Sequence, residues 1–228
     1  MEGFVRLYDQ GLIYRANRLC NWSCKLQTGI SDLEVEFLDL EKPTEIVVPG
    51  HKEKITFGTL TYFAYPIIGS SERIIVATTR LETMLGDTAV AVNSKDPRYT
   101  HLIGKSLLHP IIKDRKIKII ADDILVDMKF GTGAVKVTPA HDPNDFDCGI
   151  RNKLEFINIF TSDGKINENG GVYKGLMRFD CRKLLFEDLQ KLGLIIKVEP
   201  NKMRLGMCQR LITLEDVMIK KLLGVEIL

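Results

Sequence analysis

The chain has 228 residues, of which 45% are hydrophobic, and its 32 basic and 30 acidic side chains give a net charge of +2. This length and apolar content suit one large domain, or a core domain with a smaller appendage, and exclude a disordered chain. The balanced charge excludes a strongly basic nucleic-acid binder, and no apolar run approaches the roughly 20 residues of a membrane helix.

The N-terminus, MEGFVRLYDQ, carries acids where a signal peptide would be basic and then apolar. The five cysteines are odd in number and include no Cys-x-x-Cys pair, which argues against a disulfide framework and for a reduced compartment. Cys20, Cys24 and Cys208 are candidate zinc ligands, but a structural site needs four ligands, so we predict no metal. We expect a cytoplasmic protein without membrane contact.

Residues 2–12 predict a short amphipathic helix, because Phe4, Leu7, Tyr8 and Leu12 share one face at helical spacing. An extended segment follows at 14–22. Strands then dominate, and the expected ones are 33–40, 44–48, 59–68 and 73–78, with a hairpin or tight crossing at 69–71.

Thr79-Arg80-Leu81-Glu82 has the form of a capping box, with Thr79 as the cap and Glu82 reaching back. Arg80 and Thr83 would then sit on the first turn of a short helix. The plain interpretation of Arg80 is a solvated residue, but the free N–H groups at a helix start also suit a phosphate or an ester carbonyl.

Short strands among polar turns are expected at 89–92, 111–112, 116–120 and 124–126, and their spacing suggests a closed, barrel-like sheet. Further strands are expected at 156–160 and 194–198. A helix at 180–192 ends at Gly193, and an amphipathic helix is expected from 211 onward. The predicted fold is mainly β with peripheral helices, an α+β protein. We divide it into a base at 1–40, a core at 41–200 and an exit segment with the C-terminal helix at 201–228.

The stretch from Phe130 to Arg151 collects polar groups at the end of a short strand, 134–137. Asp142 is an N-cap residue type, Pro143 suits the first helical position, and Asp145 is the acid at the third. Taken singly, these residues are a cap, a dipole-complementing acid and solvated neighbours. Taken together with a cation and a hydroxyl from the strand, they indicate a site. Its members are Lys136, Thr138, His141, Asp142 and Asp145.

This stretch closely resembles one motif of the editing domain of valyl-tRNA synthetases, and residues 77–84, ATTRLETM, resemble that domain's other motif. The resemblance runs from about Glu2 to about Gln209. Isoleucine relatives would read Thr-Pro-Trp-Thr at 80–83 and His at Lys136, so the valine branch fits better. The resemblance implies the closed β-barrel-like core of the valine, isoleucine and leucine editing domains. It also implies hydrolysis of threonyl-tRNA(Val), with the acceptor end of tRNA(Val) and the rest of the parent synthetase as partners of a monomeric fragment.

The resemblance also implies roles for the site residues. Asp145 would bind the substrate ammonium, while Lys136, Thr138 and Asp142 would surround the threonine hydroxyl. Phe130 would wall the pocket, and Arg80 and Thr83, beside Thr79, would hold the ester and the terminal ribose. We expect catalysis to depend on Asp145, Lys136 and Thr83, with attack by a positioned water. His141 is a candidate general base, although a structural role is expected more strongly.

The chain has no His-x-Gly-His and no Lys-Met-Ser-Lys sequence, so ATP and Mg²⁺ are expected only in the parent's catalytic domain and editing needs no cofactor. Some relatives carry a cysteine zinc knuckle just after the residue that matches Trp22, but in this chain Leu26 occupies the position of its second Cys. The alternatives are an isoleucyl editing domain, a non-catalytic module binding the tRNA acceptor end, and a metallohydrolase using His141, Asp142 and Asp145. A pure binder needs no acid for an ammonium, which disfavours the second.

Overall fold

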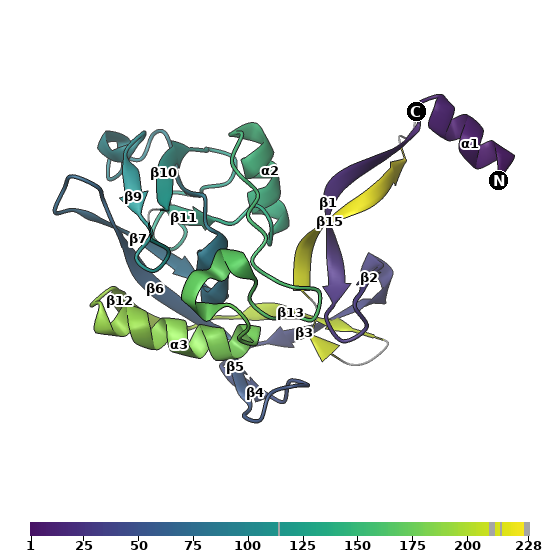
Figure 1. Cartoon of the computed structure of the whole chain (residues 1–228). Helices are drawn as coiled ribbons and strands as arrows, with labels where there is room; N and C mark the ends of the chain where they lie inside the picture. Colours follow the sequence, from purple (N-terminus) through teal and green to yellow (C-terminus); the bar gives the residue numbers. More distant parts are fainter. Residues whose placement is uncertain (114, 210–212, 215, 226–228) are drawn as a thin grey trace.

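Strands supply most of the regular structure, with few helices around them (Figure 1). The computed structural model describes residues 1–113, 115–209, 213–214 and 216–225. The helices in these ranges are α1 (Glu2–Asp9), α2 (Pro143–Arg151) and α3 (Arg178–Lys191), with four short 3-10 segments: η1 (Asp32–Glu34), η2 (Leu81–Gly86), η3 (Thr100–Leu102) and η4 (Glu168–Tyr173). This mixed, mainly β composition is the predicted α+β class.

Two sheets form the core. In the first, β12 (Ile195–Pro200), β6 (Thr59–Pro66) and β7 (Arg73–Thr78) run antiparallel, and the predicted hairpin joins β6 to β7. The second has the order β11–β8–β10–β9, made from β8 (Ala89–Val92), β9 (Ser106–Leu108), β10 (Lys116–Ala121) and β11 (Ala134–Val137).

The strand β8 lies inside the second sheet, pairing with β10 in parallel and with β11 antiparallel. All four of its residues are buried, as expected of a strand covered on both faces. An isolated bridge between Ile67 and Leu107 links the two sheets at one corner. Closure of the whole barrel stays a prediction.

The main hydrophobic core lies between these sheets and α3. Phe63 and Tyr65 of β6 are fully buried, as are Leu185 and Leu189 of α3. Leu185 and Leu189 therefore anchor α3 on this core, whereas Leu184 and Leu192 are exposed.

The base of the molecule is a ribbon in which β1 (Ile13–Ser23) pairs with β15 (Asp216–Val225) and, at its far end, with β2 (Thr28–Ile30). The helix α1 lies at the tip of this ribbon, near the end of β15 (Figure 1). Both the helix and the extended segment after it were predicted, but Phe4, Leu7 and Tyr8 are exposed.

The predicted C-terminal helix from 211 to 228 is wrong where the structure describes this segment. Residues 213–214 form β14 (Thr213–Leu214) and residues 216–225 form β15. The apolar residues have helical spacing, but tertiary pairing decides the structure, because the backbone of β15 pairs with β1 from Ile13 to Trp22. The remainder of the predicted helix, at 211–212, 215 and 226–228, lies outside the described residues.

Two smaller sheets complete the fold. In one, β13 (Met203–Cys208) pairs with β3 (Val35–Leu40) and β14, and in the other β4 (Thr44–Ile46) pairs with β5 (Ile55–Phe57). Within the described part of the chain, no helix combines the length and the hydropathy needed to cross a bilayer.

Three predicted strands are turns or irregular segments. The ring of His109 accepts the N–H groups of Ile111 and Ile112, and the carboxylate of Asp122 accepts that of Ile124. These local bonds replace a strand ladder at 111–112 and 124–126. At 156–160 only Phe160 pairs, through an isolated bridge with Ile166.

Candidate functional site

One open cavity of about 320 Å³ brings together every residue that the sequence singled out as a site residue. It lies where the chain leaves β7, where β11 ends and where α2 begins, and β7 and β11 are neighbours. The nine predicted residues on its wall are Thr79, Arg80, Thr83, Phe130, Lys136, Thr138, His141, Asp142 and Asp145. The sequence did not indicate the others, Leu60, Ala77, Thr78, Leu125, Val135, Asn144 and Asn201.

The start of α2 places Asp145, and its geometry is the predicted one. Asp142 is the N-cap, with its Oδ1 accepting the N–H groups of Asn144 at 2.9 Å and of Asp145 at 3.1 Å, and Pro143 follows it. Capping by Asp142 therefore leaves the Asp145 side chain for another use.

The Asp145 carboxylate is buried at the cavity wall, with the residue only 7% exposed. Its Oδ2 accepts the backbone N–H of Thr138 at 2.8 Å. Burial raises the pKa of Asp145 to about 7, against the opposing charge of Lys136. A buried carboxylate on the wall of a cavity is a suitable partner for a cation that enters it.

Lys136 and Thr138 both come from the β11 end of the cavity and are both buried. Lys136 Nζ lies 2.5 Å from Thr138 Oγ1 and 3.0 Å from Oδ1 of Asp87, a residue that the sequence analysis did not single out. Asp87 also accepts from Thr138 Oγ1 and from the Tyr65 hydroxyl, at 2.5 and 2.8 Å. The only signal for it in the sequence is one acid, followed by Thr88, inside the mainly apolar run 84–92.

The segment after β7 holds Arg80 and Thr83. Arg80 is the N-cap of η2, and its guanidinium donates to the His141 carbonyl at 3.1 Å. The Thr83 hydroxyl donates to the Arg80 carbonyl at 2.8 Å, so it can only accept from a ligand. The hydrogen bond from Arg80 to His141 connects the start of η2 to the segment just before α2.

The predicted capping box at 79–82 is wrong. Arg80, and not Thr79, precedes η2, without a side-chain cap, and Glu82 is 1% exposed. Glu82 receives two hydrogen bonds from Arg182 of α3, at 2.6 and 2.8 Å. Leaving a buried carboxylate without a charged partner costs more free energy than leaving a helix start without a cap. Glu82 therefore pairs with Arg182 and does not cap η2.

His141 is 1% exposed, and its Nε2 accepts the backbone N–H of Ile159 at 3.1 Å. Its ring also packs edge to face on Phe160, with centroids 4.9 Å apart. These contacts fit the structural role and leave Nε2 engaged.

Phe130 stands on the rim of the cavity and is 74% exposed. Gly131 and Gly133 adopt positive φ, as the turn before β11 requires. At Gly133 the space for a side chain is taken by the Arg98 guanidinium, which would lie 2.3 Å from an added Cβ.

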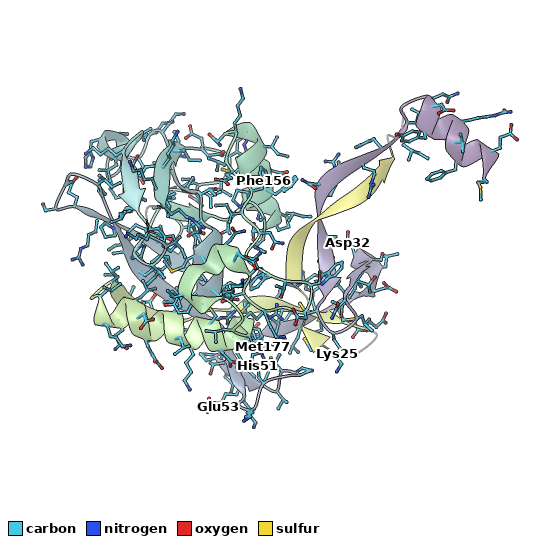
Figure 2. The ribbon with its side chains drawn as sticks, viewed as in Figure 1. Lys25, Asp32, His51, Glu53, Phe156 and Met177 are labelled. Carbon is cyan, nitrogen blue, oxygen red and sulfur yellow. The ribbon has the colours of Figure 1, made fainter. Side chains whose placement is uncertain are left out.

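A second hollow of about 220 Å³ lies beside the β4–β5 hairpin, lined in part by His51 and Met177, which Figure 2 labels. It contains none of the nine predicted residues. Across the described ranges, no three His, Cys, Asp or Glu side chains are grouped so as to hold a metal ion.

Residues 1–212 match the profile of the family described as tRNA synthetases class I (I, L, M and V). The chain is 56% identical over 220 residues to a mitochondrial valine–tRNA ligase of Arabidopsis thaliana and 56% identical over 210 residues to that of Saccharomyces cerevisiae. It is 50% identical over 211 residues to the valine–tRNA ligase of Homo sapiens. These matches cover 96%, 92% and 92% of this chain but only 20%, 19% and 16% of the relatives, so the chain spans a fifth or less of their length.

Proposed function

The chain belongs to the class I tRNA synthetases, and from this membership we propose that it is the proofreading domain of a valyl-tRNA synthetase, hydrolysing threonine from mischarged tRNA(Val). The observation that carries the proposal is the single cavity on which all nine predicted residues converge, with a buried acid and a buried cation on its wall.

The need for such a site follows from the shapes of the two amino acids. Threonine differs from valine by a hydroxyl in place of a methyl, and a hydrophobic pocket rejects it poorly. Valyl-tRNA synthetase is itself the known example, with discrimination of only ~100-fold, a general figure and not a result of this structure. A second, polar pocket can prefer the threonine hydroxyl to the valine methyl.

The polar wall of the cavity can supply that preference. Lys136 Nζ and Thr138 Oγ1 are hydrogen-bonded to each other at 2.5 Å, and a threonine hydroxyl placed beside both would accept from Lys136 and donate to Thr138. A valine methyl would leave the remaining N–H of Lys136 and the remaining acceptor site of Thr138 without a partner, at about 1–3 kcal/mol for each. Valyl esters would therefore be spared.

The substrate's ammonium would pair with Asp145. This carboxylate provides the acceptor, and its place on α2 is fixed by the Asp142 cap and by the Thr138 N–H. An entering cation would also favour ionisation of a carboxyl whose pKa burial has raised to about 7.

The ester end would lie toward η2. Arg80 is held by the His141 carbonyl, and Thr83 has only acceptor capacity left, which suits a ribose hydroxyl as donor. None of the five cysteines lines this cavity, and we infer direct attack by a positioned water without a covalent enzyme intermediate. His141 orients the wall through Ile159, and in this proposal it does not take the proton.

The remaining assignments concern the parent protein. The partner is the acceptor end of tRNA(Val) carrying threonine, in translation in the cytoplasm. ATP and Mg²⁺ would serve only the synthetic domain, which lies in the rest of the parent synthetase.

The test is deacylation of threonyl-tRNA(Val) by the isolated chain, with and without a chelator. We expect repeated turnovers that the chelator does not change. Binding without release of threonine would point instead to a non-catalytic acceptor-end module, and activity lost with the chelator would point to a metallohydrolase. Either result would overturn the proposal.

A further inference from the structure

Behind the cavity wall lies a carboxylate that does not itself line the cavity. Asp87 follows η2 directly and is 0% exposed, yet three donors converge on it. Lys136 Nζ and Thr138 Oγ1 both reach its Oδ1, at 3.0 and 2.5 Å, and the Tyr65 hydroxyl reaches Oδ2 at 2.8 Å. Burial raises the pKa of Asp87, whereas Lys136, Thr138 and Tyr65 all stabilise its ionised form.

These contacts determine which way each hydrogen bond runs. An ammonium only donates and a carboxylate only accepts. The Thr138 hydroxyl therefore donates its one proton to Asp87 and accepts from Lys136, 2.5 Å away. Thr138 is left with acceptor capacity alone, while Lys136 keeps a third N–H beyond its bonds to Asp87 and Thr138.

The cavity consequently presents an acceptor, Thr138, beside a donor, Lys136. The hydrogen bonds of both residues to Asp87 fix these roles. A hydroxyl can satisfy both at once, and a methyl can satisfy neither. If Asp87 were absent, the Thr138 hydroxyl could rotate and Lys136 could turn toward Asp145. The positive charge of Lys136 already acts to lower the pKa of Asp145. In that position Lys136 would compete with a substrate ammonium.

We propose that Asp87 is a positioning residue that sets the specificity of this site: from outside the cavity, it orients Thr138 and Lys136 so that a substrate side-chain hydroxyl is selected over a methyl. This inference rests on the proposed deacylase function and deepens it. Tyr65 is the third support, because it holds the other oxygen of the same carboxylate.

The test compares single-turnover cleavage of threonyl- and valyl-tRNA(Val) by the wild-type chain and by Asp87→Asn. The amide keeps the shape but removes the counter-charge of Lys136 and replaces one acceptor with a donor. We expect the threonyl rate to fall by about 10- to 100-fold, the range for a lost hydrogen bond to a charged group, without an equal fall for valyl. The ratio of the two rates should therefore drop at least about tenfold. A merely structural role would lower both rates together.

Two further variants keep the test decisive. Tyr65→Phe removes one bond to Asp87 while leaving Lys136 and Thr138 in place, so it should lower the ratio in the same direction by about two- to fivefold. It carries the test should Asp87→Asn not fold, which thermal melting of each variant reports. Asp123→Asn, an exposed acid bonded to Ser94, is the matched control and should leave the ratio unchanged.

The outcomes separate the two proposals. A wild-type chain that cleaves neither ester overturns the deacylase function and this inference with it. A selective wild-type chain whose folded Asp87 or Tyr65 variants keep its ratio overturns the role of Asp87 alone.

Discussion

Replacing Asp145 by asparagine should make the protein more stable as it becomes inactive. The carboxylate is 7% exposed, and burial raises its pKa from 3.8 to about 7. Asparagine has nearly the same shape, can still accept the Thr138 N–H, and carries no charge to desolvate. The exchange thus isolates the free energy of holding an ionised acid ready at the cavity wall.

The magnitude follows from the two pKa values. Each pKa unit corresponds to about 1.36 kcal/mol, so a rise of about three units corresponds to about 4 kcal/mol when the group is fully ionised in both states. Between about pH 4 and pH 7 the folded state keeps a proton that the unfolded state has released, so stability is lost as the pH rises. The asparagine variant does not lose stability in this way. Its free energy of unfolding, relative to that of the wild type, should therefore rise by about 3 kcal/mol between pH 5 and pH 8.5.

Urea denaturation of wild type and Asp145→Asn at several pH values measures the difference. The exposed Asp147 on the same helix supplies the matched control, and Asp147→Asn should follow the wild type at every pH. Deacylation by Asp145→Asn should fall by at least about 100-fold, on the order of 3 kcal/mol for a lost charge partner. Parallel stability curves for the variant and wild type would refute the reasoning.

Three other substitutions have defined outcomes. Lys136→Ala should lower the single-turnover rate constant at saturating enzyme, because the proposed contact of Lys136 is with the substrate side chain; a raised half-saturation concentration alone would make it a phosphate contact. Glu82→Ala leaves Arg182 without its buried partner and should cost about 3–5 kcal/mol in chemical denaturation, and a loss below about 1 kcal/mol would contradict this. Gly133→Ala forces a Cβ onto Arg98 at positive φ and should destabilise by about 1–3 kcal/mol; an unchanged melting temperature would show that the turn can relax.

The parts of the site that depend on local chemistry could be predicted from the sequence. The start of α2 is one such part, because Asp142 and Pro143 act on their own next residues. The strand at 134–137 is another, because its alternation and the glycine turn before it are local. These two elements were enough to place Lys136, Thr138 and Asp145 on one wall.

The parts set by distant partners could not be predicted. Asp87 meets Lys136 across 49 residues, and Glu82 meets Arg182 across 100, so no short window contains either pair. Glu82 even mimics a capping pattern, which desolvation overrides. The C-terminal helix failed for the same reason, because β15 follows the ladder offered by β1 and not its own apolar spacing.

The central claim is that this cavity removes threonine and spares valine, and one measurement tests it most directly. Threonyl- and valyl-tRNA(Val) are cleaved side by side under single-turnover conditions, with enzyme saturating and RNA concentrations matched. One donor site on Lys136 and one acceptor site on Thr138, each left without a partner by valine at about 1–3 kcal/mol, predict that the threonyl ester is cleaved at least about 30-fold faster. Equal rate constants for the two esters would contradict the account.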